Sequence, residues 1–283
     1  MKYLRTLFTL LCFTILSMPA QELTVMSYNI RLDLTSDGVN AWPNRVKMLT
    51  DLIRHHAPDI VGLQEAQRHQ LDTIAALLPE YAWFGVGRDD GKDAGEFMAV
   101  LYRRTVVEPT ETSTFWCSPS PSKPGLGWDA GCNRVVTWGK FRTRKEGKVF
   151  YFYNTHLDHI GVTARKNSAA LLMDSVNART GSLPVIITGD FNSGPGDAPY
   201  MTITSGSNRR AMKDALSIAE RPPYGPRGTF NGFNISEYST DPIDYIFVSS
   251  GISVRSHAVL TDSFHGRFPS DHFPLLAVVR LPK

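Results

Sequence analysis

Side chains that can bind a metal ion or transfer a proton recur where the short apolar runs of this sequence begin or end. Six runs are bordered by a carboxylate, an amide or an imidazole, namely Asn29, Glu65, His156, Asp190 with Asn192, Asp244, and Asp271 with His272. If these runs are strands whose ends converge, the groups form an oxygen-rich site with two imidazoles. Oxygen donors without thiolates suit Mg²⁺, Mn²⁺ or Ca²⁺ better than Zn²⁺. Such a cation polarises a phosphoryl oxygen while a carboxylate activates water, so the pattern predicts phosphoester hydrolysis.

Taken singly, each group also has a structural explanation. The stretch from Asp190 to Gly196 is a good turn sequence, in which the aspartate caps a strand. His156 or His272 alone is more often a hydrogen-bonded structural histidine. The hypothesis of one site therefore depends on the joint occurrence of all six segments in one order.

Strands are the dominant element that the hydrophobic pattern predicts. They are expected at 23–28, 59–64, 97–102, 134–141, 149–155, 185–188, 243–248 and 275–281. Helical spacing is present in three places, at Val46, Leu49 and Ile53, at Leu71, Ile74 and Leu78, and over 163–177. Because helices alternate with strands only in part, a sandwich of sheets covered by helices is favoured over a regular parallel barrel. No repeat or polar linker divides the chain, so one domain is expected over 21–283.

In this order, the six segments resemble the endonuclease/exonuclease/phosphatase superfamily. The resemblance runs from Asn29 to His272 and is most specific at Gly189-Asp190-Phe191-Asn192 and Ser270-Asp271-His272, with Gln64-Glu65 and Thr155-His156-Leu157 also matching. It implies an α/β fold, a four-layered sandwich of two mixed β-sheets packed face to face with helices on the outer faces. It also implies that 21–283 is a catalytic domain.

The resemblance implies how the metal and the water are held. Glu65 is the principal metal ligand, and Asn29 and Asp271 complete or bridge the site. The cofactor is Mg²⁺, with Mn²⁺ as the alternative. Asp190 orients or activates the attacking water, and Asn192 holds a phosphate oxygen.

Two histidines complete the implied catalytic set. His156 and His272 grip the phosphate and stabilise its developing charge. Asp244 orients His272. Glu96 does the same for His156, an assignment that rests on position alone.

Substrate contacts are expected in two loops. The stretch 229–234 is similar to the deadenylase and nocturnin branch of the superfamily, where Asn231 or Phe233 can meet a base or another planar group. The alternative for this stretch is an aromatic turn that packs on the sandwich edge. Arg134 is a reasonable phosphate contact because a guanidinium matches two phosphate oxygens at once.

Residues 1–20 have the three parts of a secretory signal peptide, with cleavage expected near Ala20. The apolar stretch is shorter than a membrane-spanning helix needs, and Leu11 before Cys12 does not fit a lipoprotein. Without Lys2 and Arg5, 28 basic side chains face 27 acidic ones, a formal charge of +1. That balance does not indicate a strongly basic nucleic-acid surface. The protein is expected outside the cytoplasm, secreted, periplasmic or on the cell surface.

Two cysteines remain in the mature chain, Cys117 and Cys132. In an oxidising compartment they can pair across a loop rich in proline and glycine, and this disulfide is the expectation. Two separate thiols are the alternative.

These observations predict a secreted, divalent-metal-dependent phosphoesterase, acting foremost on phosphodiester bonds in the manner of a nuclease. A phosphatase or phosphodiesterase acting on inositol phosphates, lipid headgroups or sugar phosphodiesters is the first alternative. A catalytically silent binding module with the same fold is the second. The expected partner is a phosphoester substrate, either nucleic acid or a small phosphodiester. The protein itself is expected to be a monomer that does not insert stably into a membrane.

Overall fold

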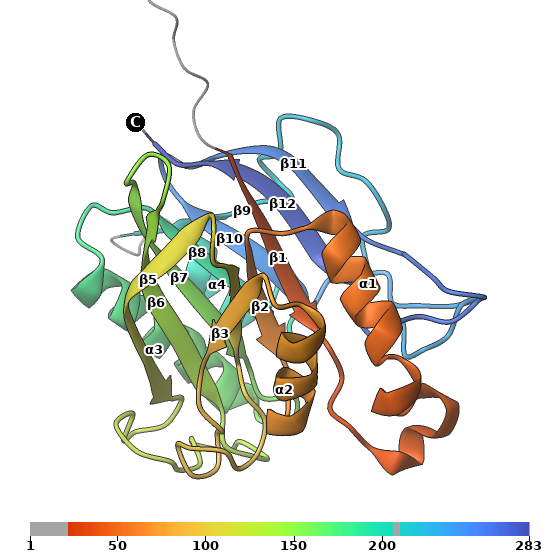
Figure 1. Cartoon of the computed structure of the whole chain (residues 1–283). Helices are drawn as coiled ribbons and strands as arrows, with labels where there is room; N and C mark the ends of the chain where they lie inside the picture. Colours follow the sequence, from red (N-terminus) through yellow and green to blue (C-terminus); the bar gives the residue numbers. More distant parts are fainter. Residues whose placement is uncertain (1–21, 206–209, 283) are drawn as a thin grey trace, which may run out of the picture.

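A computed structural model, which describes residues 22–205 and 210–282, places two six-stranded mixed sheets face to face (Figure 1). The first sheet has the order β11-β12-β1-β2-β4-β3, with β1 (Glu22–Asn29), β2 (Ile60–Gln64), β3 (Tyr81–Phe84), β4 (Val100–Arg103), β11 (Ser253–Val259) and β12 (Leu275–Arg280). The second has the order β5-β6-β7-β8-β10-β9, with β5 (Val107–Trp116), β6 (Val135–Thr143), β7 (Val149–His156), β8 (Val185–Asp190), β9 (Met212–Asp214) and β10 (Asp244–Ser249). The expected signal peptide lies outside the described residues.

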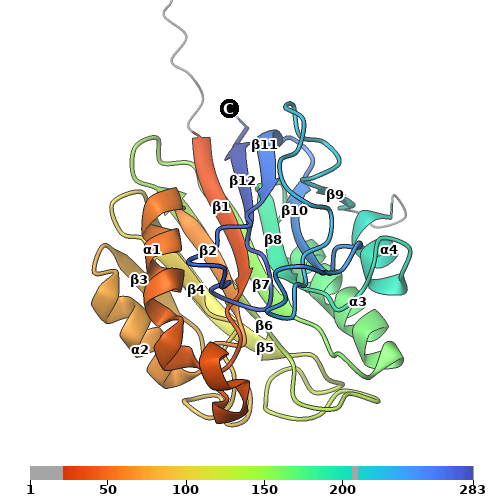
Figure 2. The same cartoon turned by 90° about the vertical axis from the view of Figure 1, so that its right-hand side faces the viewer.

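Helices cover the outer faces of both sheets. Figure 2 shows α1 (Val46–His56) and α2 (Arg68–Leu77) on one side and α3 (Val162–Arg179) and α4 (Ala198–Thr204) on the other. Two 3₁₀ turns, η1 (Thr35–Asn40) and η2 (Trp42–Asn44), lead from β1 into α1. The four-layered α/β sandwich predicted from the sequence is therefore confirmed.

Three apolar layers follow from the alternation of side chains along each strand. In β1, Val25 points between the sheets, whereas Met26 packs under α1 and α2. In β7, Phe152 points between the sheets, whereas Tyr153 packs under α3. The central strands β2, β8 and β10 are buried on both faces, so their interiors are largely apolar and polar side chains collect at their ends.

Strand direction brings the predicted site residues to one edge. β1 and β2 run parallel in the first sheet, and β7 and β8 run parallel in the second, so all four end on the same side. β10 and β12 run antiparallel to their neighbours and begin on that side, which places Asp244 and the 270–272 segment there. The arrangement explains why polar residues lie at the ends of some runs and at the beginnings of others.

The sequence prediction missed elements with weak patterns, namely β3, β5, β9, β11, α4 and the two 3₁₀ turns. One strand is shorter than predicted, because β4 begins at Val100 rather than at residue 97. Phe97 instead forms isolated bridges with Ala66 and Gly87, so Glu96 belongs to a loop. None of the helices in the described residues is long and apolar enough to span a bilayer.

The expected disulfide is wrong, because both cysteines are free. Cys117 is buried beneath α3 and belongs to the apolar layer there, with Leu157 and Ala169. Cys132 lies elsewhere, with its Sγ 3.7 Å from a carboxylate oxygen of Asp158. The proline-rich loop leaves the two thiols in separate environments.

Candidate active site

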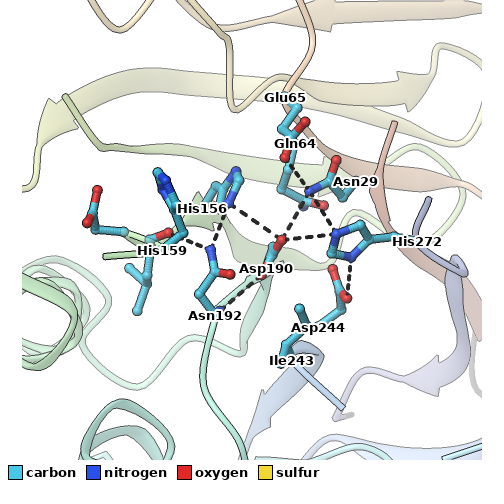
Figure 3. A network of polar contacts seen from close by, with 12 residues as sticks. Asn29, Gln64, Glu65, His156, His159, Asp190, Asn192, Ile243, Asp244 and His272 are labelled. Carbon is cyan, nitrogen blue, oxygen red and sulfur yellow. Dashed lines mark hydrogen bonds and ion pairs between the residues drawn. The ribbon is translucent and has the colours of Figure 1, made fainter. Parts of the chain in front are cut away.

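Asp190, the last residue of β8, lies at the centre of a buried polar cluster (Figure 3). Its Oδ2 lies 3.0 Å from Asn29 Nδ2, 3.5 Å from His156 Nε2 and 3.7 Å from His272 Nε2. Its Oδ1 accepts a 3.0 Å hydrogen bond from the backbone N–H of Asn192. A single carboxylate therefore joins residues from both sheets.

A second carboxylate holds His272. The Nδ1 atom of His272 lies 2.8 Å from Oδ2 of Asp244, which pairs with Asp190 across β8 and β10. Both ring nitrogens of His272 thus face carboxylates, as Figure 3 shows. This is the contact that an orienting role of Asp244 requires.

Burial and neighbouring charges shift the pKa values of these groups in different directions. Burial, with the negative charge of Asp244, raises the pKa of Asp190 to about 7. Burial opposes protonation of His272, but the carboxylates of Asp244 and Asp190 outweigh it and raise the pKa of His272 well above its usual value. Burial and the Arg134 guanidinium hold the pKa of His156 well below its usual value. At neutral pH the cluster therefore combines a cationic and a neutral imidazole with a carboxyl group that can take up a proton.

Glu65 and Asp271 supply oxygen donors beside this cluster. Glu65 accepts hydrogen bonds from Asn29 Nδ2 at 3.0 Å and from the Leu32 backbone at 3.1 Å. Asp271 Oδ2 lies 3.6 Å from Arg31 Nη1. Burial and the negative charge of Glu65 raise the pKa of Asp271, and a cation beside the two carboxylates relieves that repulsion. Two carboxylates and an amide, without a thiol, fit a hard divalent cation.

The backbone turns sharply where two of these side chains leave their strands. Glu65, directly after β2, has φ +61°, and Asn192, two residues after β8, has φ +46°. A left-handed conformation is uncommon for a glutamate and persists only where its surroundings hold it. At Glu65 the two hydrogen bonds to its carboxylate do so.

Two groups of three side chains in the described segments offer donor atoms within 4.8 Å of one another, namely Asp190 with Asp244 and His272, and Cys132 with Asp158 and His159. The first group is the buried cluster already described and has the spacing of a metal site, but the proton that Asp244 and Asp190 hold on His272 competes with a metal ion there. In the second group the positively charged Arg134 side chain already contacts two of the three residues. Its Nε lies 3.3 Å from Asp158 and its Nη2 lies 2.9 Å from His159. That guanidinium opposes a metal ion there.

The site opens into a cavity of about 550 Å³, a size typical of small-molecule sites. Its lining combines Glu65, Asp190, Asp271 and His272 with the arginines Arg31, Arg88 and Arg134. Arg134, predicted to contact phosphate, therefore reaches the cavity, although its side chain is only 4% exposed. Asp158 holds it from behind.

The expected contact between Glu96 and His156 is absent. Glu96 instead pairs with Arg88, whose Nη1 donates to Glu96 Oε2 at 2.7 Å. His156 Nε2 faces Asn192 Nδ2 at 3.0 Å, and within the described residues its buried Nδ1 has no hydrogen-bond partner. The prediction was wrong because Glu96 lies in a loop hairpin rather than at the start of a strand.

The 229–234 loop also differs from its predicted use. Asn231 is buried and structural, since its Nδ2 donates to the Ser270 carbonyl and its Oδ1 accepts from the Phe233 backbone. The Phe233 ring lies 5.9 Å from the Arg45 guanidinium and does not line the cavity. Phe230 does line it, 40% exposed and packed edge-on against His272 at 5.1 Å between ring centroids.

Sequence reasoning missed several cavity residues, namely Arg31, Arg88, His159 and Phe230. Arg31 and His159 follow recognised site residues by two and three positions, which was an available signal. Arg88 had none, because its place depends on how a loop folds.

Comparison with known proteins agrees with this geometry. The model of the endonuclease/exonuclease/phosphatase family matches residues 26–272. A crystal structure of a protein of that family from Bacteroides thetaiotaomicron is 36% identical, with a TM-score of 0.90, and the match covers 94% of this chain and 100% of that one. A mannosyl-6-phosphatase of the same species is 38% identical, with a TM-score of 0.86, over 91% of this chain and 99% of the other.

Similarity to the nocturnin branch is confirmed, but it is distant. Rat nocturnin is 25% identical over 283 aligned residues, which cover 88% of this chain and 62% of nocturnin. The chain spans about three fifths of the length of the first curated relatives it matches. The family match covers nearly all of the described chain and includes all six predicted segments. The chain belongs to the endonuclease/exonuclease/phosphatase family.

Proposed function

We propose that this chain is a divalent-metal-dependent phosphatase that removes phosphate from a small phosphorylated sugar. The observation that carries the proposal is the position of one carboxylate oxygen, Asp190 Oδ2. It lies within 3.7 Å of an amide and two imidazoles of different charge, and Asp190 lines a cavity of small-molecule size.

Glu65 and Asp271 would hold the metal ion, with Asn29 beside them. When bound, a divalent cation polarises the phosphoryl group and stabilises charge on the leaving oxygen. Arg31 lies 3.6 Å from Asp271 and fixes that carboxylate, since it also donates to Asp37. Mg²⁺ fits the oxygen donors, and Mn²⁺ is the alternative.

The proton steps fall to residues of the buried cluster. Asp190 takes a proton from the attacking water, for which a pKa of about 7 is well matched to neutral pH. His272 stays protonated beside Asp244 and donates its Nε2 proton to a phosphoryl oxygen. Asn192 Nδ2 lies 3.0 Å from His156 Nε2 and donates at 3.0 Å to the Leu157 carbonyl, so this amide positions His156 rather than an oxygen of the substrate. In-line attack by water needs no covalent intermediate.

A small sugar phosphate suits the cavity better than a polymer. The arginines that line the cavity are each paired with an acidic side chain, and no run of basic side chains extends from the cavity along the sequence. Polyanion binding draws on clustered, unpaired Lys and Arg. The 38% identity to a mannosyl-6-phosphatase over nearly the whole chain supports the same substrate class.

Single-stranded nucleic acid is the second candidate, and one observation favours it. The Phe230 ring is 40% exposed at the cavity beside His272, where a base can stack on it. This keeps the nuclease prediction open in a form that uses Phe230 instead of Phe233.

The experiment is a comparison of kcat/KM, with Mg²⁺, on mannose 6-phosphate, inositol phosphates, a sugar phosphodiester, sphingomyelin and oligo(A) RNA. The proposal predicts that the sugar monoester is preferred at least tenfold. Preference for RNA would replace it with the nuclease, and a Phe230→Ala variant would then lose RNA cleavage selectively. Silence on all substrates, with Mg²⁺ bound, would support a binding module.

We also propose that the protein acts outside the cytoplasm. The support is the charged, apolar and small-residue pattern of residues 1–20. Intact-mass measurement of the protein from an expressing bacterium tests it. A mature species that begins near Gln21 is expected, and a cytoplasmic protein that retains Met1 or begins at Lys2 contradicts it.

A further inference from the structure

A salt-bridged pair that the proposed chemistry does not use faces the active-site cavity. Arg88 Nη1 lies 2.7 Å from Glu96 Oε2, and the two side chains are 13% and 11% exposed. Both residues line the cavity that also contains Asp190 and His272. Neither hydrogen-bonds to a residue of the buried cluster.

The loop that carries this pair is a tight hairpin. The Arg88 backbone N–H donates to the Glu96 carbonyl at 3.0 Å, and Gly87 N–H donates to the Lys92 carbonyl at 2.8 Å. A Cβ at Gly87 would lie 2.3 Å from the Ala94 carbonyl oxygen, so the close approach requires glycine.

Neighbouring elements fix the hairpin from outside. Trp116 Nε1 donates to the Arg88 carbonyl at 2.7 Å, and Asn133 Nδ2 donates to Asp89 at 3.2 Å. The pair is therefore presented in one orientation before any ligand binds, which lowers the entropy cost of binding.

Part of the pair's hydrogen-bonding capacity is unused. Within the described part of the chain, Glu96 Oε1 has no hydrogen-bond partner, whereas Arg88 Nε is buried 3.9 Å from Asp89 Oδ1. His159 lines the same cavity, and its Nδ1 faces Arg134 Nη2 at 2.9 Å, which leaves Nε2–H to donate. The wall of the cavity thus offers a strong acceptor with donors near it.

This combination matches neighbouring hydroxyl groups. Each hydroxyl both donates and accepts, so a carboxylate oxygen with adjacent N–H donors satisfies two hydroxyls of a sugar ring at once. A phosphate would have to compete with Glu96 for the Arg88 guanidinium. A metal ion would meet the Arg88 guanidinium, which already neutralises that carboxylate.

We propose that Glu96 and Arg88 form the hydroxyl-binding subsite of this cavity, and that Glu96 selects phosphate monoesters of polyhydroxylated sugars. The inference rests on the proposed phosphatase function and identifies the part of the cavity that binds the hydroxyl groups of the sugar. Glu96 is a specificity-determining residue here, and the chemistry at phosphorus stays with the Asp190 cluster.

The test compares two substrates in the full-length protein with Mg²⁺. Mannose 6-phosphate carries the hydroxyls, whereas p-nitrophenyl phosphate presents a flat ring without them. For Glu96→Gln, kcat/KM on the sugar phosphate is expected to fall at least tenfold more than kcat/KM on p-nitrophenyl phosphate, chiefly through KM. Glu220→Gln is the matched control, since Glu220 also pairs with an arginine, Arg280, but lies outside the cavity.

Each outcome has a distinct meaning. Equal losses on both substrates would overturn the subsite and assign Glu96 to the common chemistry or to folding, which the thermal midpoint separates. No loss on either would also overturn it, while the phosphatase function would stand. A wild-type protein without preference for the sugar phosphate would instead refute the proposed function.

Discussion

His272 lies between two carboxylates, 2.8 Å from Asp244 through Nδ1 and 3.7 Å from Asp190 through Nε2. One imidazole thus connects the carboxylate proposed to activate water with a second carboxylate behind it. Because all three side chains are buried, their charges act on one another with little screening by solvent. The cationic state of His272 depends on this arrangement.

Removal of the charge on Asp244 is expected to disable the site without unfolding it. In Asp244→Asn the imidazole loses the anion that holds its proton, and kcat should fall roughly 100-fold or more. Phosphate release at saturating substrate measures the effect. Asp59→Asn is the control, since Asp59 is a half-buried carboxylate at the opposite end of β2. Similar losses in both variants would contradict a specific role for Asp244.

The pH profile of kcat/KM should be bell-shaped. Asp190 must be deprotonated to act as a base, so activity should rise with pH on a limb well above the ordinary aspartate range, because burial raises its pKa. His272 must be protonated, so activity should fall only well above the ordinary histidine pKa. Asp244→Asn removes the charge that raises the pKa of His272 and should move the alkaline limb to lower pH. An alkaline limb that does not move would exclude His272 as its source.

The predicted site residues that lie together in the structure are polar side chains that directly border a run of strand-forming residues. Asp190, His272 and Asn29 were identifiable because each borders a buried strand, and parallel pairing brings such ends together. Glu96 was misplaced because its loop lacks any periodicity. Phe233 was predicted to contact the substrate, but Phe230 lines the cavity instead. The turn that begins at Asn231 determines which of the two rings faces the cavity, and the sequence pattern does not reveal this.

A buried histidine away from the cavity should make stability depend on pH. Burial lowers the pKa of His257 to about 4, and its Nδ1 has no partner among the described residues. The unfolded chain binds a proton at this histidine near pH 6.5, whereas the folded chain does so only near pH 4. The contribution of neutral His257 to the free energy of unfolding is therefore complete above pH 6.5 and is lost as the pH falls towards 4. From pH 7 to 5 it amounts to about 2 kcal/mol of unfolding free energy.

Urea denaturation at pH 7 and pH 5 measures this effect. His257→Gln should reduce the difference in stability between the two pH values, whereas His265→Asn, at an exposed loop position, should leave it unchanged. An identical pH slope in the His257 variant would show that other groups govern acid stability.

The two cysteines should behave as separate thiols. Burial raises the pKa of Cys117 to about 12, so it should resist iodoacetamide in the folded protein and react only after unfolding. The half-buried Cys132 should react first. Both cysteines lie in the tryptic peptide 105–134, because Lys123 precedes a proline, so fragmentation of this peptide in tandem mass spectrometry locates each label. An internal disulfide in that peptide, in protein isolated without reductant, would contradict the separate thiols.

In the proposed reaction a divalent metal and Asp190 act together on a phosphoester. The measurement that tests this is the rate of phosphate release from mannose 6-phosphate by wild-type protein and Asp190→Asn, before and after chelation and after Mg²⁺ is restored. We predict that chelation abolishes wild-type activity, that Mg²⁺ recovers it, and that Asp190→Asn is inactive in every condition while it retains the wild-type thermal midpoint. Wild-type activity that survives full chelation would show that no metal ion is needed, and a fully active Asp190→Asn would show that this carboxylate is not the base.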